Sequence, residues 1–303
     1  MGRVLVLGNA GLDLTLQLPR MPVEGETLLG DSVDSAPGGK GLNQAVAAAR
    51  TGIQTIFHAP IGRDAQGQEI TSALRVEGLA ELELHRMPYP SDYSLLMVLP
   101  DGENSIVSAG SCAAALTVEM AEIFAAKASP GDVVMLQGNL TQASTLAALD
   151  IASARGAITL LNPAPLWWNV EALLFACDII VVNRGEAEAI TNHSEPAEAA
   201  AVLCKLGASL AIVTLGAGGC VAFDSEGTSR HYPAPHVNAI DTTGCGDTFC
   251  GVFAAMLAMG RSHETAINLA QSAAALTAQR LGAFTALPSH AELDALIARI
   301  QGH

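Results

Sequence analysis

The sequence predicts an α/β protein with a mostly parallel central sheet and a small antiparallel sheet beside it. Short β-branched apolar runs alternate with longer Ala-rich segments along most of the 303 residues. This alternation indicates parallel strands joined by helices that cover both faces of the sheet. Half of the residues are hydrophobic and only 15% are charged, which supplies enough apolar surface for a large core.

The central sheet accounts for most of the expected elements. Its strands are expected at residues 3–7, 55–59, 133–137, 158–161, 179–182, 210–214 and 220–223. The helices between them are expected at 42–51, 69–77, 143–155, 185–191 and 196–206, and later ones at 247–260, 263–279 and 291–300. Ligands of such sheets bind beyond the carboxyl ends of the strands, so polar motifs that follow these strands are the functional candidates.

Two stretches, 14–36 and 89–107, contain alternating short strands with no helix between them and a turn at 100–102. They predict a small antiparallel sheet that projects from the main domain as a lid. Two ordinary surface hairpins are the alternative. On the first interpretation, the main domain comprises residues 1–13, 37–88 and 108–303.

The charge balance narrows the range of partners. Lys and Arg number 15 against 30 Asp and Glu, a net charge of −15. Nucleic acids and anionic lipids are bound chiefly through basic patches, so neither nucleic acid nor membrane is expected as a partner. A nucleotide remains possible, because magnesium and backbone N–H groups can neutralise its phosphates locally.

The cysteines and the apolar segments indicate the compartment. Six scattered cysteines without a C-x-x-C pair argue against a zinc site or a disulfide framework and fit a reducing environment. No apolar run reaches the ~18 residues of a membrane-spanning helix. We therefore expect a cytoplasmic protein.

The strongest local motif is the run DTTGCGDTF at residues 241–249. Gly244 and Gly246 allow a tight turn, so the N–H groups of Gly244, Cys245, Gly246 and Asp247 would converge at a helix N-terminus, which favours an anion. Asp247 could then accept the proton of an attacking hydroxyl during phosphoryl transfer. A capped helix without function is the alternative. Cys245 would be either a reactive thiolate at this helix end or a small residue that fills space.

A second motif, PGGKGLN at residues 37–43, leads into a helix. Its glycines let the backbone approach a ligand closely, and Lys40 and Asn43 offer hydrogen-bond donors. It lacks the spacing of a Walker A loop, and a plain turn before a helix is the alternative. Asp13 closes the first strand, where the hydroxyls of a substrate could reach it.

Two further motifs follow strands. Asn183 and Glu186 offer oxygen atoms suited to hydrated magnesium, although an Asn before a helix is usually a cap. The Gly-rich run TLGAGG at 214–219 could seat a nucleotide or be only a tight turn. It lacks the context of a dinucleotide fingerprint, which argues against a dehydrogenase.

These residues together resemble the ribokinase-like (PfkB) carbohydrate kinases, from one end of the chain to the other. The two signatures of that family correspond to residues 38–52 and 241–249, in this order, with an N-x-x-E match at 183–186 and a T-x-G match at 214–216. The resemblance implies a ribokinase-like three-layer α/β/α sandwich with a small β lid. It also implies transfer of the γ-phosphoryl group of ATP to a hydroxyl of a small, ribose-like sugar, with Mg²⁺ and possible activation by K⁺.

The resemblance also assigns roles to individual residues. It implies that Asp247 is the catalytic base and that the anion hole is formed at Gly244, Cys245 and Gly246. The sugar-binding positions that it implies are Asp13, Gly39, Lys40, Asn43, Asn139 and Asp247. The nucleotide positions are Asn183, Thr214, Gly216 and Gly219. Glu186 corresponds to a position that holds magnesium through water, and Asp241, Thr243 and Gly282 correspond to the site of a monovalent cation.

Several departures leave the substrate open. Gly11 stands where ribokinases tend to carry Asn, Asn139 where they use Glu, and Ala286 where a Ser contributes to the cation site. A nucleoside or sugar-phosphate kinase of the same fold is therefore the alternative. A catalytically silent sugar-binding protein is disfavoured because Asp247 and its turn are retained. Apolar residues on the second face of the lid, at Leu95, Met97 and Leu99, predict a homodimer.

Overall fold

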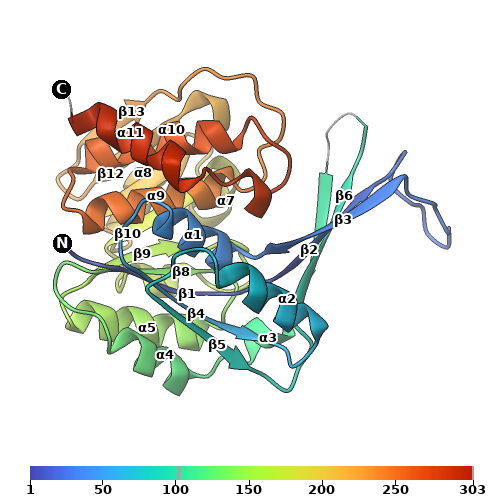
Figure 1. The fold of residues 1–303 in the computed structure, drawn as a ribbon. Helices are drawn as coiled ribbons and strands as arrows, with labels where there is room; N and C mark the ends of the chain where they lie inside the picture. The colour runs from blue at the N-terminus through green and yellow to red at the C-terminus, as the bar shows by residue number, and fades with distance from the viewer. Residues whose placement is uncertain (101–103, 302–303) are drawn as a thin grey trace.

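The computed structural model describes residues 1–100 and 104–301 and has three layers, with a nine-stranded sheet between two layers of helices (Figure 1). The sheet order is β13-β12-β11-β10-β9-β8-β1-β4-β5. Its strands are β1 (Val4–Leu7), β4 (Thr55–Ile61), β5 (Glu81–Arg86), β8 (Val133–Gln137), β9 (Ile158–Asn162), β10 (Ile179–Asn183), β11 (Leu210–Thr214), β12 (Cys220–Asp224) and β13 (Ser229–Tyr232). All neighbours from β11 to β5 are parallel, and β12 and β13 add antiparallel strands at one edge.

Helices cover both faces of this sheet, which explains why the inner strands are apolar at successive positions. Alternate residues of β1 enter separate cores, Val4 and Val6 on one face and Leu5 and Leu7 on the other. The first core also contains residues of α1 (Lys40–Ala49), α2 (Ala65–Leu74), α9 (Cys245–Ala258), α10 (His263–Thr277) and α11 (His290–Gln301). The second contains residues of α3 (Ser111–Ala114), α4 (Val118–Ala125), α5 (Gln142–Ala154), α6 (Glu171–Leu174), α7 (Arg184–Thr191) and α8 (Pro196–Lys205).

A smaller sheet projects from the side of the main body (Figure 1). It consists of β2 (Gly11–Gln17), β3 (Ser32–Gly38), β6 (Asp92–Val98) and β7 (Asn104–Ala109), in the order β3-β2-β6-β7. Each predicted stretch forms a hairpin, and the two hairpins pair with each other in one sheet, so they are not two independent surface hairpins. The turn expected at 100–102 falls largely outside the described residues.

The pairing in this sheet differs in one respect from the fully antiparallel arrangement that the sequence suggested. The outer pairs are antiparallel, whereas the central strands β2 and β6 are parallel. Parallel neighbours need a long crossover, and here α1, β4, α2 and β5 intervene between the two hairpins. Both hairpins leave the main body in the same direction, so β2 and β6, their first strands, run parallel to each other.

The expected strands of the main sheet are present, with ends that differ by no more than two residues. The sequence analysis missed β5, β13, α4 and the short helices α3 and α6. None of the described helices combines the length and the apolar character needed to cross a membrane.

Candidate active site

The turn before α9 has the conformation that the glycines of the second signature predicted. Gly244 has a left-handed φ of 78° and directly precedes α9. A Cβ atom at this position would meet Ala283 Cα at 3.0 Å, so both the conformation and the space favour glycine. Asp247 lies in the first turn of α9 and is only 7% exposed. The N–H groups of this first turn have no acceptor within the helix and are suited to an anion.

The carboxylate of Asp247 faces residues of the first signature, on α1. Gln44 donates to its Oδ1 over 3.0 Å and Asn43 to its Oδ2 over 3.4 Å. The Nζ atom of Lys40 lies 3.8 Å from Oδ1, and this carboxylate raises the pKa of Lys40. The two signatures, about two hundred residues apart in the chain, thus meet around one carboxylate.

A chain of buried amides holds Gln44 in place. Its carbonyl accepts from Gln137 over 2.8 Å, and its amide also donates to Asn162 over 3.1 Å. Asn162 in turn donates to the carbonyl of Val181 over 2.9 Å. Sequence analysis missed these three side chains. The available signal was a single amide at the carboxyl end of each otherwise apolar strand, β8 and β9.

Asp13, on β2, belongs to the same site. Its carboxylate lies so close to the next strand that a Cβ on Gly38 would come within 2.1 Å of Oδ2. The pKa of Asp13 is raised to about 6, chiefly by burial and also by the charge of Asp247, while a hydrogen bond from Ser94 opposes the rise. Gly39 lies between Gly38, which adjoins this carboxylate, and Lys40, the first residue of α1.

Several buried amide oxygens have no hydrogen-bond partner among the described residues. They are Asn43 Oδ1 and Asn139 Oδ1, together with Gln137 Oε1 and Gln271 Oε1. Buried acceptors are normally paired, so the oxygens of Asn43 and Asn139 could each accept a hydrogen bond from a bound hydroxyl. Asn139 follows β8 at its carboxyl end, the edge at which such sheets bind ligands.

A cavity of about 590 Å³ adjoins Asp247. The predicted nucleotide positions Asn183, Thr214, Gly216 and Gly219 line it, together with Lys40 and the turn at 244–247. Another part of its lining is apolar and is formed by Ala234, Pro235, Val237, Phe249, Ala274, Ala275 and Ala278. One cavity thus offers backbone donors near Asp247 and apolar surface suited to a flat heterocycle.

Asn183 and Glu186 cap α7 reciprocally. Asn183 Oδ1 accepts from the N–H of Glu186 over 2.8 Å, and Glu186 Oε2 accepts from the N–H of Asn183 over 2.9 Å. This is the capping arrangement that the sequence analysis kept as an alternative. The charge of Glu186 also contributes to the raised pKa of Lys40, so its carboxylate faces the same region as Asp247.

The residues predicted to hold a monovalent cation lie together. Asp241 Oδ1 accepts from the N–H and the hydroxyl of Thr243, over 2.9 and 2.6 Å. Asp241 Oδ2 accepts from the N–H of Gly282 over 2.9 Å. One carboxylate therefore ties the loop before α9 to the segment after α10.

The surroundings of Cys245 favour one of the two expectations for it, a small residue that fills space, over a reactive thiolate. Burial raises the pKa of its thiol to about 11, and the charges of Asp241 and Asp247 act in the same direction. Its N–H donates to the carbonyl of Thr242 over 3.2 Å, so this group serves the turn itself. These observations favour a space-filling role for Cys245 and anion binding by other backbone groups of this turn.

Comparison with known proteins agrees with this geometry. The profile described as pfkB family carbohydrate kinase matches residues 1–290. A ribokinase of Haemophilus influenzae is 34% identical over 293 residues, which cover 95% of each chain. A ribokinase of Mus musculus is 31% identical and is matched over 93% of its length and 96% of this chain.

Solved structures give the same result. The ribokinase of Thermotoga maritima has a TM-score of 0.87 and 28% identity, with coverage of 98% of this chain and all of the other. The ribokinase of Arabidopsis thaliana, solved with ribose and ATP, has a TM-score of 0.85, 27% identity and coverage of 98% and 99%. The fold and the family expected from the sequence are confirmed. The chain belongs to the pfkB family of carbohydrate kinases, which are phosphotransferases with an alcohol group as acceptor.

Proposed function

We propose that this carbohydrate kinase transfers the γ-phosphoryl group of ATP to a hydroxyl, most simply a primary one, of a ribose-like sugar. The observation that carries the proposal is the position of Asp247, between the amide donors of Asn43 and Gln44 and beside the nucleotide-sized cavity. The relatives described as ribokinases, one of them solved with ribose and ATP, support this choice of substrates.

In the proposed reaction, Asp247 accepts the proton of the attacking sugar hydroxyl. The hydroxyl oxygen forms a bond to the γ-phosphorus while the bond from that phosphorus to the β–γ bridging oxygen breaks, which releases ADP. N–H groups of the turn at 244–247 and the ammonium group of Lys40 stabilise the charge on the transferring group. Asp247 then returns its proton to solvent.

The sugar would lie between Asp13, Asn43 and Asn139. The unpaired amide oxygens of Asn43 and Asn139 and the carboxylate of Asp13 are acceptors for the hydroxyls of a small polyol. A phosphorylated sugar would need convergent cations instead. Two of the arginines that could serve are engaged elsewhere, Arg20 with Glu26 and Arg86 with the carbonyl of Gly62.

The residues fit the expected ions. Glu186 and Asn183 offer oxygen atoms near the cavity, which suits the loosely held, largely hydrated Mg²⁺ of ATP sites. Mg²⁺ would neutralise phosphate charge during transfer. The loops that Asp241 ties together at Thr243 and Gly282 would hold K⁺ through backbone oxygens. A buried alanine, Ala286, stands at the position of the serine expected in that cation site, so K⁺ activation is proposed to be weak.

The small sheet would act as the lid of a cytoplasmic enzyme. Its strands begin at Gly11 and end at Ala109, so the main domain is a few residues shorter at these junctions than the expected 1–13, 37–88 and 108–303. Asp13 lies on one face of this sheet, and Leu14, Leu95 and Val107 share the opposite face at one register. Val107 is 61% exposed, so this second face offers apolar surface to another lid. We propose a homodimer that pairs these faces.

The test is release of ADP from MgATP with a panel of pentoses, hexoses, phosphosugars and nucleosides, with and without potassium. Ribose or a closely related pentose should give the highest kcat/KM. Turnover confined to nucleosides or phosphosugars would replace the proposed substrate and retain the kinase. Absence of turnover with every acceptor, by a protein that binds MgATP, would overturn the kinase proposal.

A further inference from the structure

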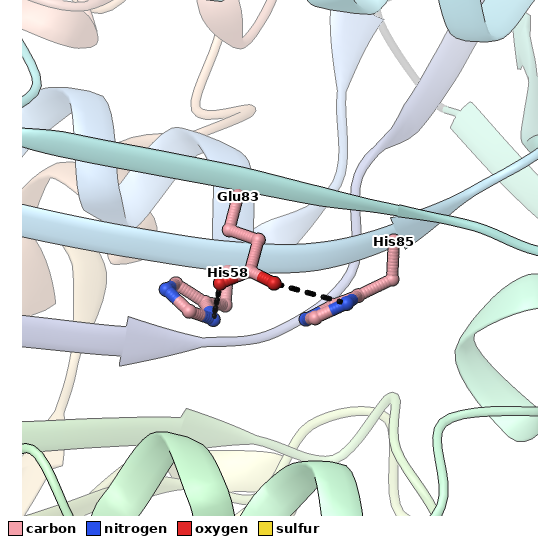
Figure 2. Close-up of side chains that lie close together, drawn as sticks. All are labelled: His58, Glu83 and His85. Carbon is pink, nitrogen blue, oxygen red and sulfur yellow. Dashed lines mark ion pairs between the residues drawn. The ribbon is translucent and has the colours of Figure 1, made fainter.

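A cluster of two histidines and a glutamate lies away from the active site, at the edge of the main sheet. His58 is on β4 and pairs in register with Glu83 of β5, and His85 follows two residues later on the same face of β5 (Figure 2). The ring of His58 packs on Phe124 of α4, 4.9 Å between centroids. This β4–β5 cluster (His58, Glu83 and His85) is thus on the face covered by α4, opposite to the face covered by α1 and α9.

The three side chains converge on a small volume. The Nδ1 atom of His58 is 3.3 Å from one carboxylate oxygen of Glu83, and the Nδ1 atom of His85 is 3.6 Å from the other (Figure 2). One nitrogen or oxygen atom from each residue lies within 4.8 Å of the other two. Ligands at about 2.0–2.2 Å from a tetrahedral zinc ion are themselves only slightly more than 3 Å apart. Small side-chain rotations would therefore bring the three atoms into a common coordination shell.

The two ring nitrogens of His58 have different neighbours. Its Nε2 lies 2.9 Å from Glu81 Oε1 and 3.2 Å from the ammonium nitrogen of Lys127, while its Nδ1 faces Glu83. With the proton on Nε2, directed at Glu81, the ring presents the Nδ1 lone pair to Glu83. A carboxylate that holds the distal nitrogen is also the usual partner of a metal-bound histidine.

His85 is not accounted for by hydrogen bonding within the protein. Its Nε2 atom is buried and has no partner among the described residues. Neutral imidazoles are the form that binds metal ions.

The charges around the cluster leave room for a cation. Lys127 forms an ion pair with Glu81 and lies 3.8 Å from Glu83, while Arg3 is paired with Asp132. One ammonium group thus faces two carboxylates. Glu83 is 51% exposed, which gives an ion a path from solvent.

We propose that His58 Nδ1, Glu83 and His85 Nδ1 bind one zinc-class transition-metal ion, with water as a further ligand. Two imidazoles and one carboxylate suit zinc, whereas magnesium and calcium prefer oxygen ligands alone. The cysteine pattern argued against a zinc site, but that expectation depended on thiolate ligands, and this ligand set needs no cysteine. The ion would fasten the edge strand β5 to β4, on the opposite face of the sheet from the kinase site.

The test is titration of the metal-free protein with ZnCl₂ against a competing chromophoric chelator. The wild-type chain should bind one Zn²⁺, and Glu83→Gln and His85→Gln should each weaken binding by at least about 10-fold. The matched control is His193→Gln, which removes a histidine that also lies beside a glutamate, 3.5 Å from Glu198, but stands alone. It should bind as the wild type does.

Co²⁺ provides an independent readout that does not depend on kinase activity. Bound Co²⁺ should give visible bands of a four-coordinate nitrogen and oxygen site, without the thiolate charge-transfer band that cysteine ligation would produce. Thermal unfolding in EDTA shows whether each variant folds, and Glu83→Gln, at an exposed position, should match the wild type there. Absence of stoichiometric binding by the wild type, equal binding by the Glu83→Gln chain, or a thiolate band would overturn the proposal.

Discussion

Asp13 should reduce the stability of this protein at neutral pH, and Asp13→Asn should relieve that cost. Burial raises the pKa of Asp13 from 3.8 to about 6, and the neighbouring charge of Asp247 adds to the effect. A difference of about two pH units corresponds to about 3 kcal/mol of unfolding free energy, at 1.36 kcal/mol per unit. Because the side chain is not fully buried, we take this value as the upper end.

The sign follows from which state holds the proton more tightly. Between about pH 4 and pH 6 the native Asp13 is still protonated while the unfolded one has ionised, so the native state loses stability as pH rises. The cost is complete above pH 6 and absent below about pH 4. Asparagine has nearly the same shape and no charge. The variant should therefore exceed the wild type by about 2–3 kcal/mol at pH 7.5 and equal it near pH 4.

Urea unfolding of both proteins at several pH values measures this difference. Asp92, whose pKa burial also raises to about 6, titrates in both chains and cancels. In the same variant the KM for sugar should rise while that for ATP stays constant, because an amide replaces the carboxylate acceptor at a cost of about 1–3 kcal/mol. A stability difference that does not change with pH, or a variant less stable than the wild type at pH 7.5, would refute the reasoning.

Three other predictions concern the remaining parts of the site. Asp247→Asn should lower kcat by ~10²–10⁴ with little change in ligand affinity, and near-normal turnover would remove Asp247 as the base. Cys245→Ala should keep most of the activity, and a thiol-alkylating reagent should modify Cys245 no faster than the other buried cysteines; rapid, MgADP-sensitive inactivation would contradict this. Leu95→Glu should dissociate the proposed homodimer in sedimentation velocity, whereas a wild-type monomer at micromolar concentration would exclude that dimer.

The parts of the fold that were predictable from the sequence carry their signal in a few consecutive residues. β1 and β8 are apolar at every position that faces a core, and each is followed by a glycine-containing turn or a polar residue. The two signatures likewise combine glycines with functional side chains within short runs. Such local patterns predicted the main strands and helices. They also identified Asp247, Lys40 and Asn43, which the fold places side by side.

The missed parts depend on partners far away in the chain. β5 was missed because its sequence, Glu-Leu-Glu-Leu-His-Arg, has only two apolar residues. Leu82 and Leu84 pack against the core, and the other face of the strand carries charged and polar side chains. The parallel pairing of β2 with β6 depends on the direction in which two distant hairpins leave the body. Gln44 contacts Gln137 across 93 positions, so no local pattern reveals the amide chain behind Asp247.

At Cys245, burial and the end of a helix act in opposite directions on the same thiol. A helix N-terminus typically stabilises an anion by about 0.3–1 kcal/mol. Burial, together with the charges of Asp241 and Asp247, nevertheless raises the pKa of this thiol to about 11, which disfavours the thiolate. Asp247, two residues further in the same turn and more deeply buried, instead receives hydrogen bonds from Asn43 and Gln44 of α1. A position at the helix end therefore does not by itself favour a charged side chain; the specific side-chain donors are directed at the carboxylate that the proposed reaction uses.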